Sequence, residues 1–200
     1  MAGRYTKILK TKATNQMLKD EKIRGQVYRK SREIFELKKQ QMLEDFKSHP
    51  VTREIERGPD APNMSNTIFG PGNLYSFIGF RDGETPIDPV YELLRAGTRL
   101  STARPRVQKV GNRVYMGFRV ITPTVRELST VSKMPWEPGS WLFKVERGIS
   151  GLGLYIYEKY IKASRSGTGI QADGKVRTGG YKPTKYMSAI LNTFKRNFKR

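Results

Sequence analysis

Apolar residues recur at helical spacing through the first quarter of the chain. Residues 15–47 contain no proline and one glycine, and most of them are good helix formers. The apolar positions that carry the period are Ile23, Val27, Ile34, Phe35, Met42, Leu43 and Phe46. The pattern predicts a helix of about 50 Å, at about 1.5 Å per residue, that ends at His49-Pro50 because proline disfavours helix in the preceding residue. Such a helix packs either across its own domain or against a partner.

The middle of the chain has a weaker pattern. Residues 58–86 lack a sustained period and predict an extended loop. Inside this loop the short apolar run 74–80 predicts a strand. Residues 88–97 predict a short helix. The N-cap, the first helical residue and the exit of that helix are predicted at Asp88, Pro89 and Gly97.

Alternation of apolar and polar residues predicts a β-hairpin over residues 104–122. One face of its second strand carries Val114, Met116, Phe118 and Val120. The dipeptide Gly111-Asn112 suits a two-residue turn between the strands. Basic residues occupy both strands, so the hairpin is a basic ribbon.

The last third of the chain mixes apolar segments with a long glycine-rich stretch. Residues 141–149 predict a helix capped by Ser140, and residues 154–161 predict a strand. Residues 164–181 predict a flexible loop. The closing segment, Thr184 to Lys199, predicts an amphipathic helix that packs on the sheet. Its apolar positions are Met187, Ile190, Leu191, Phe194 and Phe198.

These elements predict an α+β fold with a long N-terminal helix and a small antiparallel sheet. Residues 1–14 form a loose basic arm, and residues 15–57 form the long helix and its exit. Residues 58–200 form an α+β domain with extended loops at 58–86 and 164–181. A long loop in a compact domain is often functional, and we expect the first loop to contact a neighbouring subunit. Candidate interface residues are Asp60, Phe69, Asn73, Asp82 and Glu84.

The net charge restricts the possible classes of function more than any sequence motif does. The chain has 38 Lys and Arg against 18 Asp and Glu, a formal net charge of +20. So basic a chain repels its own copies unless a polyanion or an acidic neighbour compensates, and nucleic acid is the usual polyanion. Residues 59–98 are the exception, with two basic and five acidic residues. This acidic segment suits a basic patch on a neighbouring subunit.

Two groups of basic residues are candidate contacts to nucleic acid or to an acidic partner. The hairpin group is Arg104, Arg106, Lys109, Arg113 and Arg119. The group around the glycine-rich loop is Arg165, Lys175, Arg177, Lys182 and Lys185. Lysine and arginine neutralise phosphates without reading sequence, so we expect non-specific binding. A surface loop without any contact is the alternative for the second group.

The sequence shows no recognisable set of catalytic or metal-binding residues. His49 is the only histidine and there is no cysteine, which removes the usual triads and zinc ligand sets. The carboxylates are scattered, and Glu54 and Glu56 would lie on opposite faces of a strand. The sequence Gly174-Lys175-Val176 lacks the Ser or Thr that completes a phosphate-binding loop. We expect no enzymatic activity, no cofactor, no small-molecule substrate and no membrane partner.

Four stretches, taken in order, carry a family resemblance. They are the N-terminal helix running into His49-Pro50-Val51-Thr52, the segment closed by Asn73 to Phe80, the segment Lys144 to Gly151, and Lys182-Pro183-Thr184 before the last helix. In this order they resemble the neck and tail-completion proteins of tailed bacteriophages.

The resemblance implies an α+β virion protein that acts as a head–tail joining or tail-terminator subunit. It implies a homo-oligomeric ring, often a hexamer, between the head connector and the tail-tube or sheath proteins. DNA passes through the lumen of such a ring without sequence-specific contacts. The resemblance also implies assembly in the host cytoplasm and a final location in the virion neck or tail.

Two other classes of protein fit part of the sequence. Composition alone also suits a basic RNA-binding structural protein, such as a ribosome-associated component, which would show tight RNA binding with a steep salt dependence. A nuclease would need a carboxylate cluster for its metal ions, and the sequence does not assemble one.

Overall fold

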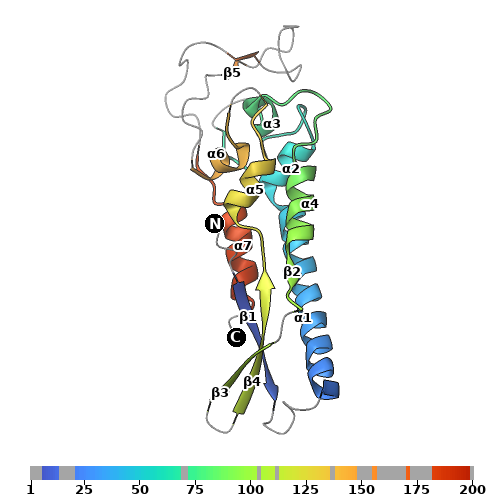
Figure 1. Cartoon of the computed structure of the whole chain (residues 1–200). Coiled ribbons are helices and arrows are strands. Elements are labelled where there is room, and N and C mark those ends of the chain that lie inside the picture. The colour runs from blue at the N-terminus through green and yellow to red at the C-terminus, as the bar shows by residue number, and fades with distance from the viewer. Residues whose placement is uncertain are drawn as a thin grey trace.

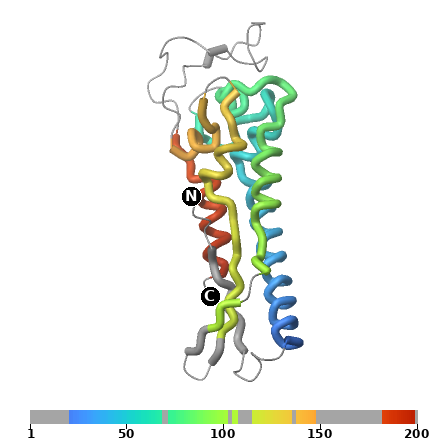
Figure 2. Tube along the Cα trace, in the orientation of Figure 1, coloured from blue at the N-terminus to red at the C-terminus, as the bar shows by residue number. Residues whose placement is uncertain are grey.

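The computed structural model describes residues 6–13, 21–68, 72–102, 105–110, 113–135, 138–147, 155–156, 170–171 and 182–198 of the 200-residue chain. The fold is α+β, as predicted, with a small antiparallel sheet beside one end of a long helix (Figure 1). Shorter helices gather at the other end of that helix (Figure 1), and the C-terminal helix runs alongside the long helix (Figure 2).

The long helix α1 spans Glu21–Ser48 and confirms the helical period of the N-terminal segment. The predicted apolar positions Phe35, Met42, Leu43 and Phe46 are all buried. Helix α1 ends one residue before His49, and Pro50 opens the next helix, α2 (Pro50–Glu56). The predicted break at His49-Pro50 is therefore confirmed, whereas the strand prediction for Glu54 and Glu56 is wrong.

His49 holds the junction between α1 and α2. Its Nδ1 atom accepts a hydrogen bond from the Val51 amide at 3.2 Å, so the imidazole caps α2. Its ring lies 4.7 Å from the ring of Tyr186, which comes from the far end of the sequence. Burial lowers the pKa of His49 below its ordinary value of 6.5. The neutral imidazole is the form that this junction requires, because a protonated Nδ1 cannot accept the bond.

A pH-dependent loss of stability follows from this junction. The unfolded chain binds a proton at His49 more readily than the folded chain does, so stability is lost as pH falls through 6.5 toward the lower folded pKa. Asparagine at this position can cap a helix but does not titrate. We expect the urea midpoint of the wild type to fall more between pH 7.5 and pH 5.5 than that of His49→Asn. Equal losses in the two proteins would contradict the role of His49.

The sheet is built around strand β4 (Arg113–Ile121). Strand β1 (Thr6–Ala13) pairs antiparallel with one edge of β4, and β2 (Arg99–Leu100) and β3 (Arg106–Val110) share its other edge, so the sheet is three strands wide. The hairpin prediction is confirmed by β3 and β4. The prediction of a loose arm is wrong for residues 6–13, because the open edge of β4 supplies these residues with backbone partners.

Alternation along β4 separates its two faces. Met116, Phe118 and Val120 are buried, as the hairpin pattern predicts. The Phe118 ring packs edge-on against Tyr28 of α1, with 5.4 Å between the ring centroids. Arg119, between two of the buried residues, is exposed. The sheet thus presents its apolar face to the core and leaves the other face available for polar residues.

The apolar run at 74–80 forms a helix, so the strand prediction there is wrong. Helix α3 spans Leu74–Ile78, and the Asn73 side chain caps it by accepting from the Ser76 amide at 2.9 Å. Gly79 ends the helix in the left-handed region with φ of 85°. Four of its five residues are buried, so the segment lacks the polar face that would have revealed a helical period.

Helix α4 spans Asp88–Gly97 and confirms the predicted helix, but not its cap. Ile87 occupies the N-cap position without a side-chain bond, and Asp88 is the first helical residue. Gly97 belongs to the helix, where an added Cβ atom would lie 2.6 Å from Cγ of Pro123. This close approach joins α4 to the segment that follows β4.

The two helical glycines should respond oppositely to alanine. Gly97→Ala is expected to cost about 1–3 kcal/mol because the new methyl group collides with the Pro123 ring. Gly25→Ala is expected to gain about 0.5–1 kcal/mol, since a Cβ atom at this site in α1 meets nothing within 4 Å and alanine favours helix. Urea denaturation of both variants checks the pair, and a Gly97→Ala chain as stable as the wild type would contradict the contact.

Helices α5 (Val125–Val131) and α6 (Trp141–Arg147) follow the sheet. Ser140 accepts from the Phe143 amide at 3.3 Å, which confirms the predicted helix start. The predicted strand at 154–161 and loop at 164–181 lie outside the described residues, apart from two short paired strands. These are β5 (Tyr155–Ile156) and β6 (Ile170–Gln171).

The C-terminal helix α7 spans Met187–Arg196 and contacts α1. The Phe35 ring of α1 lies 6.4 Å from the rings of both Phe194 and Phe198. The helix begins later than the predicted Thr184, because the Thr184 amide donates to the Val145 carbonyl at 3.1 Å and Tyr186 takes the N-cap position. All five predicted apolar positions are buried.

A buried carboxylate fixes the segment between α2 and α3. Glu54 is fully buried, and its two oxygens accept from the amides of Ser65 and Leu74, each at 2.7 Å. The Asn73 side-chain amide also donates to the carbonyls of Gly58 at 3.3 Å, Pro59 at 2.7 Å and Ala61 at 2.8 Å. The described part of the predicted 58–86 loop is therefore held by specific polar side chains.

Candidate nucleic-acid interface

Three exposed arginines lie on the face of the sheet opposite the core. They come from three strands: Arg99 from β2, Arg106 from β3 and Arg119 from β4. Arg106 is paired with Gly117 and Arg99 with Ile121, which are the positions two residues before and after Arg119. Paired residues of an antiparallel sheet share a face, so the three form one group, here called the arginine patch.

The backbone register brings lysines of β1 to the same rows. Lys10 is paired with Gly117 and Lys12 with Tyr115. Gly117 has no side chain, and Tyr115 is half-buried. The register therefore places these two lysine positions in the rows of Gly117 and Tyr115, beside the row of Arg119.

The arginine patch has no acidic neighbour along the strands. Residues 99–126 contain seven basic and no acidic residues, and β1 adds three lysines without an acid. Within the described part of the chain the ion pairs are Lys30–Glu33 at 3.1 Å and Arg95–Glu92 at 2.7 Å, both on helices. Uncompensated and exposed, these arginines are free to neutralise the phosphates of a polyanion.

The basic residues predicted to contact nucleic acid lie in more than one part of the fold. Arg106 and Arg119 are exposed on the sheet, and Lys109 and Arg113 lie on β3 and β4. Lys182 and Lys185 are exposed ahead of α7, where the Lys182 amide donates to the Thr67 carbonyl at 2.8 Å, away from the sheet. Four predicted contacts lie outside the described residues: Arg104, Arg165, Lys175 and Arg177.

The predicted subunit-interface residues differ in their exposure to solvent. Asp60, Asp82 and Glu84 are exposed, and Glu84 accepts from the Arg81 amide at 3.0 Å. Asn73 is 2% exposed, and its side chain makes hydrogen bonds within the chain. Phe69 lies outside the described residues.

Sequence reasoning missed Arg99 and the lysines of β1. Arg99 sits on a strand of two residues, which is too short to show alternation. The β1 lysines gain their place through pairing with β4, more than 100 residues away in sequence. The absence of acidic residues between positions 99 and 126 was the available signal, since it marks the segment as uniformly basic.

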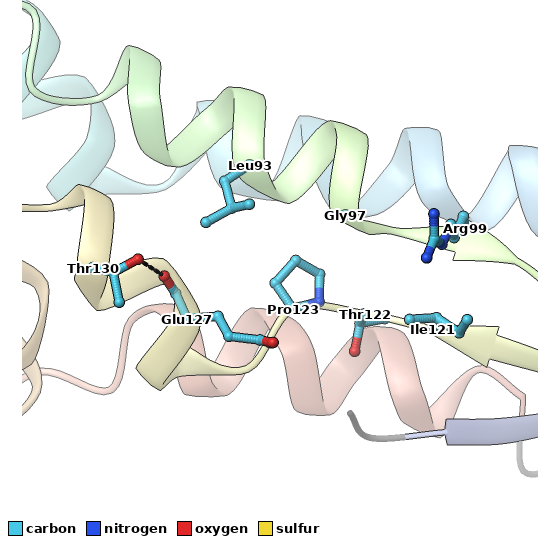
Figure 3. Close-up of a pocket in the computed structure, with 8 residues that line it drawn as sticks. All are labelled: Leu93, Gly97, Arg99, Ile121, Thr122, Pro123, Glu127 and Thr130. Atoms are coloured by element: carbon cyan, nitrogen blue, oxygen red, sulfur yellow. Dashed lines mark hydrogen bonds between the residues drawn. The ribbon is translucent and has the colours of Figure 1, made fainter. Parts of the chain in front are cut away.

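A cleft of about 330 Å³ lies between α4 and α5, close to the arginine patch (Figure 3). Its lining residues are Leu93, Gly97, Arg99, Ile121, Thr122, Pro123, Glu127 and Thr130. The Glu127 carboxylate accepts from the Thr124 amide at 2.8 Å and so completes the cap of α5. Figure 3 shows the Arg99 side chain and the Thr122 hydroxyl pointing in different directions. The polar groups therefore do not converge on one ligand.

Within the described residues, no three His, Asp or Glu side chains gather as a metal site would require. None of the described helices combines the length and the hydrophobicity needed to cross a lipid bilayer. No protein family, curated protein or solved structure significantly matches the chain.

Proposed function

We propose that this chain is a non-enzymatic structural subunit of a homo-oligomeric assembly and binds nucleic acid through the arginine patch. The observation that carries the proposal is the patch itself: Arg99, Arg106 and Arg119 lie exposed on one face of a sheet whose strands contain no acidic residue. Contacts of arginine and lysine to phosphate are insensitive to sequence, so the binding is non-specific.

The assembly we propose is the neck or tail-completion ring of a tailed phage. The support is the resemblance of four ordered stretches and a net charge of +20, which a lumen filled with DNA would compensate. The exposed acids Asp60, Asp82 and Glu84 lie on the segment between α2 and α4, far from the sheet. In a closed ring each subunit needs two different surfaces, and these acids suit the second one. Connector and tail-tube or sheath proteins are the further partners of this proposal.

We also propose that helix α7, which contacts α1, packs behind the sheet. Phe194 of α7 and Phe118 of β4 belong to one continuous buried cluster. A helix in that position stiffens the sheet behind the arginine patch and keeps the patch in one plane.

Titration of duplex DNA at several salt concentrations tests the binding function. We expect the logarithm of the affinity to fall linearly and steeply with the logarithm of salt concentration, because each neutralised phosphate contributes a slope of about −0.9. Duplexes of equal length but unrelated sequence should bind with equal affinity. Absence of binding at low salt would contradict the proposal, and a strong preference for RNA over DNA would favour an RNA-binding structural protein instead.

A further inference from the structure

We propose that β1 is an exchangeable strand: in the assembly, β1 of one copy pairs with β4 of a neighbouring copy. The proposed occupant of the β4 edge is thus a second copy of this chain. The inference rests on the proposed assembly function, and it names the surface through which neighbouring copies join.

Strand β1 has β4 as its strand partner among the described residues. It pairs with β4 over its whole length, Thr6 to Ala13, and with no other strand in the described part of the chain. The opposite edge of β4 is filled by β2 and β3. The ring contact of Tyr28 with Phe118 joins α1 directly to β4.

The register makes the β4 edge specific for β1. Lys7, Lys10 and Lys12 fall opposite Val120, Gly117 and Tyr115, and Arg119 falls opposite Ile8. No lysine of β1 therefore faces an arginine of β4. A slip of two residues one way would place Lys10 opposite Arg119, and a slip the other way would place Lys12 opposite Arg113, and like charges directly opposed are destabilising.

A copy of the same chain is the occupant that fits this edge. Exchange of an identical strand preserves every contact of the β1–β4 ladder, so it costs little in free energy. The residues between β1 and α1, 14–20, can span at most about 25 Å when extended. The exchange therefore joins adjacent copies only, and a head-to-tail series of such exchanges forms a ring when the rotation between copies closes.

The absence of cysteine makes a covalent test clean. Thr6 and Ile121 are register partners, so Thr6→Cys and Ile121→Cys place two thiols within reach of each other. The two single variants, one with a tag that changes its mass, are mixed at a concentration that supports association and treated with a mild oxidant or a short bis-maleimide. We expect a mixed covalent dimer on a denaturing gel, several-fold above the dimer formed by either variant alone.

Two controls define the outcome. Thr6→Cys mixed with Glu56→Cys, an exposed position at the end of α2, should give only background product. The double variant Thr6→Cys/Ile121→Cys should form covalent chains longer than a dimer. Exchange would be refuted by a double variant that closes only within single chains while the mixed single variants stay uncoupled. Because the assay contains no nucleic acid, that result leaves the binding function of the arginine patch to its own test.

Discussion

Glu54→Ala is expected to lower the free energy of unfolding by about 3–5 kcal/mol, because it leaves one buried and one partly buried amide without an acceptor. The amides belong to Ser65 and Leu74, and the bonds to the carboxylate are 2.7 Å long. Their loss frees both ends of the segment that leads from α2 into α3. Urea denaturation, followed by circular dichroism, measures the shift of the midpoint.

Two matched variants isolate the cause. Glu56→Ala removes an exposed carboxylate from the same helix and is expected to change stability by about 0.5 kcal/mol or less. Glu54→Gln keeps one acceptor oxygen, so its loss should fall between those of the two alanine variants. A Glu54→Ala chain within 1 kcal/mol of the wild type (about one residue's ordinary effect) would show that Glu54 does not hold this segment.

The triple variant Arg99→Gln/Arg106→Gln/Arg119→Gln is expected to bind duplex DNA at least about tenfold more weakly at low salt. The slope of log affinity against log salt should become shallower by about 3 units, one for each phosphate contact removed. All three side chains are exposed, so the substitutions should leave the fold intact. Fluorescence anisotropy of a labelled duplex across a salt series measures both quantities.

The control for this variant removes the same charge elsewhere. Arg53, Arg57 and Lys133 are exposed residues of the helical end, and their change to Gln also lowers the net charge by three. Its salt slope should remain close to that of the wild type if the contacts are local to the patch. Equal slopes for the two triple variants would mean that net charge alone, rather than the arginine patch, governs binding.

Elements with a repeating local pattern could be predicted from the sequence. Helix α1, the β3–β4 hairpin and the apolar face of α7 all show a period over many residues, and each was confirmed. Helix α3 lacks such a signal because it is five residues long and buried on nearly every side. A helix so enclosed shows the same unbroken apolar run as a buried strand, and only the Asn73 cap and the Gly79 exit distinguish the two.

The parts that could not be predicted depend on contacts between distant residues. Strand β1 has the polar sequence of an arm, and only the edge of β4 makes it a strand. Asn73 has the residue type of either a cap or a surface contact, and only the fold shows that its side chain caps α3. Of the arginine patch, the hairpin pattern gave Arg106 and Arg119, whereas Arg99 needed the β2–β4 pairing.

The most direct test of where this protein binds nucleic acid is photo-crosslinking. The wild type is crosslinked to a duplex, and the crosslinked peptides are identified by mass spectrometry. The account predicts that crosslinked peptides come from residues 99–121, which include all three arginines of the patch. Crosslinks confined to residues 50–98 and 182–198, with none on the sheet, would contradict it.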